Sequence, residues 1–280
     1  MTNNAVTNIA TALADAKTKI DALDAEALLA HVLDKDRSYF RAWPEHKLEA
    51  SQLTQFQQLV VRRTQGEPLA YLTGWREFWS LLLQVSPATL IPRPDTETLV
   101  QQALNLIPQD ANWHIADLGT GSGAIALAIA SERPGCNLVA TDICPDALAV
   151  AQTNAERLKL HNVEFRQGSW HRAFKPGEQF QLIASNPPYI DANDAHLTLN
   201  GLPHEPQQAL TPGKDGMAAI RAIAEKMRLY LYPHGWLLLE HGYDQGQAVR
   251  ETLHQQMYSD ILTHHDLGNN ERVTQGKRPN

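Results

Sequence analysis

The chain has few cysteines, no long apolar run and no recognisable targeting segment. Its 280 residues include two cysteines, Cys136 and Cys144, whose spacing fits neither a metal site nor a redox motif. We interpret both as reduced, buried thiols of a cytoplasmic protein. The polar start, Met1-Thr2-Asn3-Asn4, predicts no signal peptide, and no apolar stretch approaches the length of a membrane span.

An excess of basic residues is also missing. The formal net charge is -7, whereas domains that bind nucleic acid are usually basic, so no direct nucleic-acid partner is expected, although a local basic patch stays open. The 12 histidines are scattered without the spacing of metal ligands, and we expect no metal site. Hydrophobic residues make up 43% of the chain, which indicates an ordinary globular core.

The first part of the chain carries helical periodicity and is predicted to form a small bundle over residues 1–70. Gly66 and Pro68 are expected to end its last helix. The helical segments are Ala5–Lys17, Asp24–Leu33 and Ser51–Thr64.

Aromatic and aliphatic residues then indicate a β-hairpin with strands Thr73–Phe78 and Leu81–Ser86. We interpret residues 71–88 as a connector between domains. A rigid, proline-containing link follows, and its Asp95 is expected to cap a helix that runs to about Leu106.

From His114 onward, predicted strands and helices alternate, which indicates an α/β fold with a mostly parallel, doubly wound sheet. Residues 89–280 are assigned to this domain, and Asp191–Gly216 is expected to be a long loop. The predicted strands are His114–Asp117, Leu138–Thr141, Val163–Arg166, Phe180–Ser185, Trp236–Glu240, Ile261–Asp266 and Arg272–Gln275. The predicted helices are Ala124–Glu132, Pro145–Lys159, Ala218–Leu231 and Gln247–Gln256.

The tetrapeptide Asn186-Pro187-Pro188-Tyr189 directly follows one of these strands. Neither proline can continue a sheet ladder, since neither has an N–H, and both hold the backbone in a fixed conformation. The side-chain oxygen of Asn186 and the nearby carbonyls can accept hydrogen bonds from an NH2 group, and Tyr189 can stack on it. The segment is therefore predicted to hold a flat amide or nucleobase, although an ordinary turn has the same signature.

A glycine-rich turn, Asp117-Leu118-Gly119-Thr120-Gly121-Ser122-Gly123, lies between the first strand of the sheet and its helix. Its backbone can approach a ligand closely, and Asp142 ends the next strand, where a carboxylate suits a ribose diol. The G-x-G-x-G spacing differs from the G-x-G-x-x-G of dinucleotide sites. It favours an adenosyl sulfonium over a dinucleotide, and a turn built only for packing stays an alternative.

Several further runs accompany these two motifs, and together they cover almost the whole chain. They are Gly66-Glu67-Pro68-Leu69-Ala70-Tyr71-Leu72-Thr73-Gly74, Glu77-Phe78-Trp79-Ser80, Thr89-Leu90-Ile91-Pro92-Arg93-Pro94-Asp95-Thr96-Glu97, Leu238-Leu239-Glu240-His241-Gly242 and Asn270-Glu271-Arg272-Val273-Thr274. With them the sequence closely resembles the bacterial PrmC/HemK family, the glutamine N5-methyltransferases of peptide chain release factors.

The resemblance implies a class I, Rossmann-like methyltransferase sheet and S-adenosylmethionine as the methyl donor, with S-adenosylhomocysteine as product. The implied substrate is the glutamine of the Gly-Gly-Gln motif in class 1 release factors, recognised through residues 1–70, and a monomer is expected. The implied cofactor residues are Gly119, Thr120, Gly121, Ser122, Gly123, Asp142, Trp170 and Asn186. The implied substrate residues are Asn186, Pro187, Pro188 and Tyr189, of which Asn186, Pro187 and Tyr189 are catalytic.

The chain departs from the family pattern at two places. Ser169 stands where the family usually has Asp, and Asn200–Pro206 differs from the usual G-D-V-R-F-E-P. Three other functions are weighed against this one: an amino-group methyltransferase of DNA or RNA, a nicotinamide-dependent oxidoreductase, and an interaction module with a decayed cofactor site. Because Asn186 does not titrate, it is expected to orient the amide rather than act as a base.

Overall fold

The structure is a computed structural model that describes residues 7–198 and 201–280. The start Met1–Asn4, Ala5 of the first predicted helix and Asn200 of the altered loop lie outside these residues. Among the residues that the structure describes, no helix has both the length and the apolar character needed to cross a membrane.

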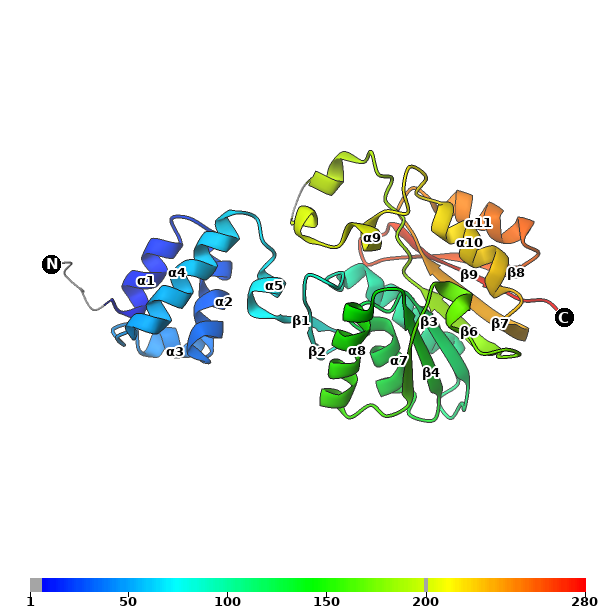
Figure 1. The fold of residues 1–280 in the computed structure, drawn as a ribbon, viewed down its shortest axis with the longest axis horizontal. Helices are drawn as coiled ribbons and strands as arrows, with labels where there is room; N and C mark the ends of the chain where they lie inside the picture. Colours follow the sequence, from blue (N-terminus) through cyan, green and yellow to red (C-terminus); the bar gives the residue numbers. More distant parts are fainter. Residues whose placement is uncertain (1–6, 199–200) are drawn as a thin grey trace. The chain divides into compact units, whose positions relative to one another are not determined.

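The chain divides into two compact units, Met1–Gly74 and Trp75–Asn280 (Figure 1). The first is a helical bundle in which Leu28, Leu29 and Phe56 lie in one buried apolar cluster. The three predicted helices are present, but the first begins at Ile9, later than predicted, with Asn8 as its N-cap. The short helices α3 and α5 are additional. The helices are α1 (Ile9–Ala16), α2 (Ala22–Leu33), α3 (Arg37–Ala42), α4 (Ala50–Thr64) and α5 (Leu69–Thr73).

The second unit begins with an antiparallel hairpin of β1 (Trp75–Phe78) and β2 (Leu81–Gln84). Its turn residues, Trp79 and Ser80, both have positive φ, of 50° and 57°, which is the conformation that a tight two-residue hairpin turn requires.

The predicted first strand of the hairpin began too early. Thr73 ends α5, and Gly74 stops that helix with a left-handed backbone at φ 81°, as glycine often does after a helix. The hairpin belongs to the second unit, because Phe78 and Leu83 are buried in its core together with residues of the helices α6 and α7.

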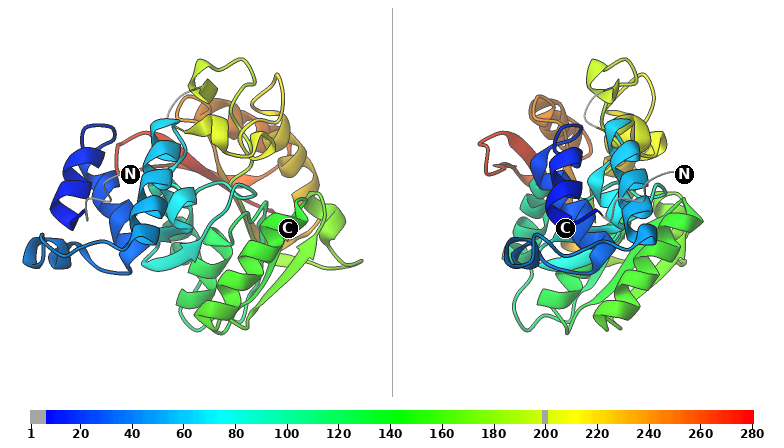
Figure 2. Two further views of the ribbon diagram at one scale, coloured as in Figure 1. Left: turned by 60° about the vertical axis from the view of Figure 1, so that its left-hand side comes forward. Right: turned by 90° about the vertical axis from the view of Figure 1, so that its left-hand side faces the viewer.

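A seven-stranded sheet in the order β5-β4-β3-β6-β7-β9-β8 forms the centre of the second unit (Figures 1 and 2). Strands β5, β4, β3, β6 and β7 run parallel, and β9 and β8 close the sheet in antiparallel fashion. The mostly parallel sheet is thus confirmed. The strands are β3 (His114–Leu118), β4 (Asn137–Asp142), β5 (Val163–Gln167), β6 (Phe180–Ser185), β7 (Leu231–Glu240), β8 (Ser259–His265) and β9 (Glu271–Lys277).

Helices cover both faces of this sheet, and neighbouring strand residues bury their side chains on opposite sides. Ile115 of β3 lies in the cluster of α6, α7 and α8, whereas the next residue, Ala116, lies in the cluster of α10 and α11. The helices are α6 (Glu97–Leu106), α7 (Ala124–Glu132), α8 (Pro145–Leu158), α10 (Ala218–Met227) and α11 (Gly246–Gln255).

Two predicted boundaries are corrected. The helix expected to run to Leu231 ends at Met227, and Leu231 already pairs with Phe180 in the sheet. Pro233 lies just beyond and cannot continue a helix. Asp95 does not cap α6, because it lies inside the short helix η1 (Pro94–Thr96) and α6 has no side-chain cap.

The predicted long loop after β6 contains the short helices η3 (Ala195–Thr198), η4 (Leu202–His204) and α9 (Gln207–Leu210). Its ends are tied together, because the Ile190 amide donates to the Leu210 carbonyl and the Ala192 amide to the Gly213 carbonyl, each at 3.0 Å. The described residues of this loop are therefore held beside the carboxyl end of β6.

Candidate functional site

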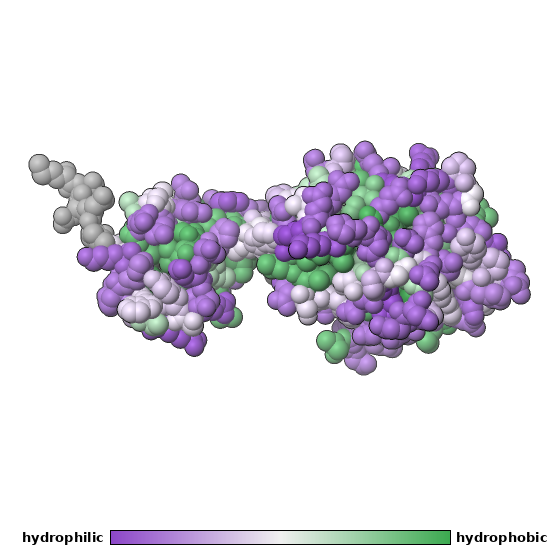
Figure 3. Space-filling model, turned by 90° about the horizontal axis from the view of Figure 1, so that it is seen from below, coloured by the Kyte–Doolittle hydropathy of each residue, from purple (hydrophilic) through white to green (hydrophobic). Residues whose placement is uncertain are grey.

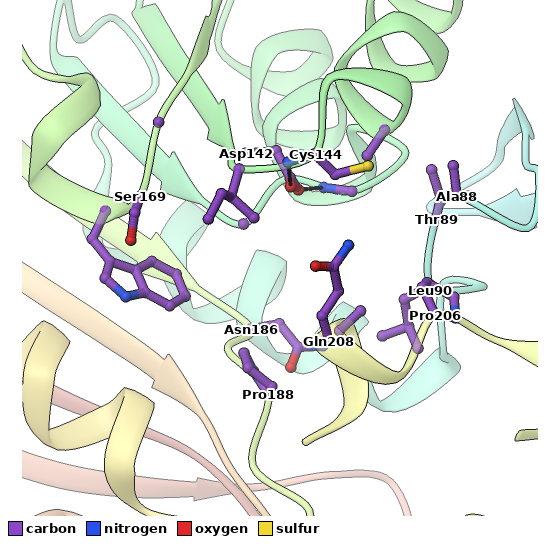
Figure 4. A pocket seen from close by; sticks show the side chains of 17 residues that line it. Ala88, Thr89, Leu90, Asp142, Cys144, Ser169, Asn186, Pro188, Pro206 and Gln208 are labelled. Atoms are coloured by element: carbon purple, nitrogen blue, oxygen red, sulfur yellow. Dashed lines mark hydrogen bonds between the residues drawn. The ribbon is translucent and has the colours of Figure 1, made fainter. Parts of the chain in front are cut away.

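The predicted motifs meet at the carboxyl edge of the parallel strands. Leu118 of β3 is aligned with Thr141 of β4 on one side and with Ser185 of β6 on the other. The glycine turn, Asp142 and Asn186 therefore follow these strands at one place, as expected for an α/β sheet. A cavity of about 270 Å³ opens there (Figure 4), slightly smaller than the ~300–1,000 Å³ of typical small-molecule sites.

Six of the predicted site residues line this cavity. They are Gly119, Gly121, Asp142, Trp170, Asn186 and Pro188. They come from four separate segments of the chain, so the structure assembles the two predicted motifs and the two isolated residues into one site.

Backbone conformation explains the glycines at the cavity wall. Gly119 and Gly121 have φ values of 72° and 56°, a region that glycine enters without a steric penalty. The Gly121 amide donates to Asp142 Oδ2, and the Cys144 amide donates to Asp142 Oδ1, both at 2.9 Å. Each carboxylate oxygen keeps a further lone pair, so Asp142 can still accept hydrogen bonds from a diol in the cavity.

Thr120, Ser122 and Gly123 lie behind the wall of the cavity. The Thr120 hydroxyl donates to Asp117 Oδ2 at 2.6 Å, and the Ser122 carbonyl accepts from Asn154 at 3.0 Å. A Cβ at Gly123 would lie 2.9 Å from Leu127 Cδ1, so this glycine permits close packing. For these residues, direct contact with a cofactor stays a prediction.

Asn154 also links the glycine turn to the hairpin. Its side-chain amide exchanges hydrogen bonds with the backbone of Gln84, at 2.7 Å and 2.9 Å, while it holds the Ser122 carbonyl. Asn154 is fully buried, and a buried amide left without these partners would be costly. The hairpin therefore supports the turn from behind.

Asp117 is the buried carboxyl beneath the turn, with 1% of its surface exposed. Its Oδ2 accepts from Thr120 and, at 3.2 Å, from the Ala126 amide in α7. Its Oδ1 is buried with no partner among the described residues. Burial is the main cause that raises the pKa of Asp117 to about 7.

Trp170 forms another wall of the cavity, which Asp142 at the end of β4 also lines. It opens the short helix η2 (Trp170–Ala173) with φ at 49°, and a Cβ at Gly119 would lie 3.6 Å from its ring atom Cζ3. The ring and the glycine turn are thus neighbouring walls of the cavity. Ser169, where the family usually has Asp, lines the cavity beside Trp170.

The tetrapeptide is divided between the cavity and the interior. Asn186 and Pro188 line the cavity, whereas Pro187 is buried and Tyr189 is half-buried. Asn186 Nδ2 donates to Thr96 Oγ1 at 3.2 Å. The Tyr189 hydroxyl donates to Glu240 Oε1 at 3.3 Å, and burial raises the pKa of Tyr189. Stacking of Tyr189 on a guest amide stays a prediction.

Several residues at the cavity were not predicted. Gln208 extends into it from α9 toward Asp142 and Cys144, and Leu90 lines the side formed by the proline-containing link (Figure 4). Cys144, expected to be buried, is partly exposed and lines the cavity, whereas Cys136 is buried as expected. The length of the loop after β6 was the available signal for Gln208.

Glu205 fastens this loop. Its side chain is fully buried, accepts from the Ile91 amide at 3.1 Å and forms an ion pair with Arg93. A buried carboxylate needs such partners, so Glu205 joins the loop to the link that precedes α6. Among residues 7–198 and 201–280, no group of three or more His, Cys, Asp or Glu side chains could hold a metal ion.

Comparisons with known proteins agree with this geometry. A family model described as the PrmC N-terminal domain matches residues 4–74, and one described as a methyltransferase domain matches residues 109–275. The chain is 53% identical over 254 residues to the release factor glutamine methyltransferase of Salmonella typhimurium, covering 91% of both chains. It is 51% identical over 254 residues to that of Escherichia coli, again covering 91% of both chains.

Solved structures show the same fold at much lower sequence identity. A methyltransferase from Pyrococcus furiosus is 17% identical with a TM-score of 0.55, covering 80% of this chain and 98% of its own. A 16S rRNA N2 G1207 methyltransferase from T. thermophilus, in complex with AdoMet and guanosine, is 15% identical with a TM-score of 0.55. This match covers 73% of this chain and 49% of that one.

Proposed function

The chain belongs to the family of release factor glutamine methyltransferases, and from this premise we propose how it acts. It transfers a methyl group from S-adenosyl-L-methionine to the side-chain amide nitrogen, N5, of the glutamine in the Gly-Gly-Gln motif of class 1 release factors. The observation that carries the proposal is one cavity lined by both the glycine turn and the Asn186 tetrapeptide.

The residues at the glycine-turn side suit the donor. When bound, S-adenosyl-L-methionine supplies an electrophilic methyl group on a sulfonium. The open lone pairs of Asp142 suit the ribose hydroxyls, and the Trp170 ring provides an apolar wall next to Gly119. Backbone atoms of Gly119 and Gly121 border the same space without a side chain in the way.

The tetrapeptide side suits the acceptor. An amide nitrogen is a weak nucleophile because its lone pair is delocalised into the carbonyl, and Asn186 cannot remove a proton from it. Since Asn186 Nδ2 is engaged by Thr96, its Oδ1 is the atom left to accept one hydrogen of the guest amide. The Pro187 carbonyl accepts the other in our proposal, and the proton leaves to solvent after the methyl group is transferred.

Orientation then does most of the catalytic work. Holding the nitrogen in line with the sulfonium methyl can lower the barrier by about 7–11 kcal/mol in favourable cases. The product is N5-methylglutamine, and the donor is released as S-adenosylhomocysteine.

We further propose that residues 1–70, which lie within the first unit, recognise the release factor. Apolar side chains reach its surface, among them Leu23, Trp43 and Val61, which are 59%, 62% and 55% exposed, and Figure 3 shows apolar surface on the visible face of this unit. Exposed apolar surface of this kind is typical of protein-binding sites. A monomer that works in the cytoplasm, without direct contact to nucleic acid, completes the proposal.

Mass spectrometry of a class 1 release factor after incubation with the protein and the donor tests this function. The expected result is the mass of one added methyl group on the glutamine of the Gly-Gly-Gln peptide. A release factor with Asn in place of that glutamine is the matched control and should stay unmodified. In a parallel incubation, DNA or RNA replaces the release factor. Methylation of the nucleic acid, with none on the release factor, would overturn the proposal and identify a nucleobase amino group as the substrate.

A further inference from the structure

The tetrapeptide is anchored at its far end by a side chain that the proposed reaction does not use. Gln245, which directly precedes α11, donates from Nε2 to the Tyr189 carbonyl at 2.9 Å and accepts at Oε1 from the Gly242 amide at 2.8 Å. We propose that Gln245 is a positioning residue that fixes the tetrapeptide for methyl transfer without touching either ligand. The inference rests on the proposed function and deepens it.

The prolines explain why the tetrapeptide needs an anchor at its end. Neither proline has an N–H, so neither can donate a hydrogen bond that would tie the backbone to its surroundings. The fixed points therefore lie on either side of the pair. On one side Ser185 belongs to β6, and its hydroxyl donates to the Leu118 carbonyl at 2.8 Å. On the other side Gln245 holds Tyr189.

The peptide unit between Tyr189 and Ile190 is held on both of its sides. Its carbonyl accepts from Gln245, and its amide, that of Ile190, donates to the Leu210 carbonyl at 3.0 Å. The first bond reaches the segment after β7, and the second reaches α9. Because a peptide unit is planar, these two bonds fix the orientation of the plane and the direction in which the chain leaves Pro188.

The polarity of its two contacts leaves the Gln245 amide one orientation. A backbone carbonyl can only accept and a backbone N–H can only donate, so Nε2 must face Tyr189 and Oε1 must face Gly242. The backbone N–H of Gln245 also donates to the Gly242 carbonyl at 3.0 Å. The side chain therefore extends from a closed turn and points at the tetrapeptide.

His241 holds the turn that carries Gln245. The ring is fully buried, and burial is the main cause that lowers the pKa of His241, so the ring is neutral. Nδ1 donates to the Gly242 carbonyl at 2.9 Å, because that oxygen can only accept, and Nε2 then accepts from the Thr274 hydroxyl at 2.8 Å. The turn is thus fastened to β9, which gives the backbone of Gln245 a fixed position relative to the sheet.

Gly216, at the end of the loop after β6, packs against the bond between Gln245 and Tyr189. A Cβ at Gly216 would lie 2.5 Å from the Tyr189 oxygen and 3.0 Å from Gln245 Nε2. A side chain cannot come that close to a backbone atom, so glycine is needed here. Close packing shields the bond from water, and a shielded hydrogen bond is electrostatically stronger than one in water.

The first test is Gln245→Leu, which keeps the approximate size of the side chain and removes both hydrogen bonds. At saturating donor and release factor, we expect kcat to fall about three- to tenfold, the equivalent of one hydrogen bond. The Kd for the donor should stay within about twofold, because the donor is held at the glycine turn and Asp142. The exposed Gln255→Leu, at the last residue of α11, is the control and should leave both values unchanged.

Gln245→Glu separates the two contacts of the side chain. At pH 8 a glutamate is ionised, so it still accepts from Gly242 but cannot donate to Tyr189. We expect kcat to fall at least as far as in Gln245→Leu, whereas the exposed Gln255→Glu should have no effect. Normal kcat in Gln245→Glu, or a loss confined to the KM for the release factor, would overturn the inference. A donor Kd that weakens in step with kcat would also overturn it, since it would indicate a general structural role.

A further readout does not depend on the release factor. Tyr189-Ile190 is the only Tyr-Ile step in the sequence, so labelling with 13C at tyrosine carbonyls and 15N at isoleucine gives one coupled NMR signal. Loss of a hydrogen bond shields a carbonyl carbon, so this signal should move upfield in Gln245→Leu and Gln245→Glu. An unchanged signal would overturn the inference. A wild-type protein that transfers no methyl group would contradict the proposed function instead, and the carbonyl signal would still decide whether Gln245 holds Tyr189.

Discussion

The two walls of the cavity are built alike but supported differently. Each is backed by one buried carboxyl, Asp117 or Glu240, with a pKa raised to about 7 and one oxygen without a partner among the described residues. Asp117 bonds to residues 3 and 9 positions away in its own strand–turn–helix segment. Glu240 accepts a hydrogen bond from Tyr189, 51 positions away in another segment.

This difference separates a local support from a non-local one. The carboxyl behind the glycine turn is held within the segment that forms the turn, although Asn154 of α8 supports the turn itself. The tetrapeptide depends on η1 and β7, so its geometry belongs to the fold of the whole second unit. We therefore expect changes at the first wall to alter donor binding and changes at the second to alter turnover.

The largest effect should come from Asn186→Ala at the tetrapeptide wall. Loss of a positioned hydrogen-bond acceptor at the reacting atom typically lowers kcat by about 10²–10³-fold, while the Kd for the donor should change much less. Steady-state kinetics with saturating donor, together with calorimetric titration of the donor, measure both quantities. The exposed Asn193→Ala is the control. Near-normal turnover of Asn186→Ala would contradict the assignment of turnover to the tetrapeptide wall.

Asp117→Asn tests the carboxyl behind the glycine wall through stability. Burial raises the pKa of Asp117 from 3.8 to about 7. Ionisation of this carboxyl therefore costs more free energy in the folded state than in the unfolded state. The folded protein pays no such cost at low pH and becomes less stable as the pH rises through this window. The neutral variant escapes this loss. Relative to that of the wild type, the free energy of unfolding of Asp117→Asn should increase by about 2–4 kcal/mol from pH 4.5 to pH 8.

Urea denaturation at both pH values measures this gain. The exposed Asp110→Asn serves as the control and should show no such pH-dependent difference. An equal pH dependence of wild type and Asp117→Asn would contradict the assignment.

Asp142→Ala should weaken donor binding by about 10–100-fold, because hydrogen bonds to a charged group contribute about 1.5–3 kcal/mol. At saturating donor the kcat should stay close to that of the wild type, in contrast to Asn186→Ala. Calorimetric titration provides the Kd, with the exposed Asp146→Ala as control. An unchanged Kd would refute the role of Asp142 at the ribose.

Gln208→Ala should have the smallest effect. Gln208 is exposed and reaches the cavity from α9, and exposed polar contacts usually contribute little. We expect a change of about two- to threefold in the Kd for the donor, against none for the neighbouring Gln207→Ala. If kcat of Gln208→Ala fell as much as that of Asn186→Ala, Gln208 of α9 would have a role in catalysis that the comparison does not assign to it.

Local patterns account for what could be predicted from the sequence. The alternation of strands and helices gave the sheet, and the glycine turn and tetrapeptide marked its ligand edge. The helix to Leu231 was overextended because Leu231 fits a helical pattern equally well, and only its pairing with Phe180 decides the matter. The short helix α5 was missed because five residues carry too little periodicity.

The support of the site was beyond such patterns. Glu240 and Asn154 look like ordinary ends and faces of their elements, and their roles arise from partners far along the chain. Thr96 lies in a run that carried the family resemblance, but nothing in that run shows that its hydroxyl contacts Asn186. Physical contact across the sheet edge, rather than residue type, makes these positions functional.

The attachment of the loop by Glu205 has a kinetic consequence. Widening of the cavity by movement of this loop breaks the half-buried ion pair of Glu205 with Arg93 and exposes the Ile91 amide. The opening that separates Glu205 from Ile91 is also the event that lets the Ile91 amide proton exchange with water. Hydrogen–deuterium exchange at this one amide would therefore measure how often the loop separates from the link before α6.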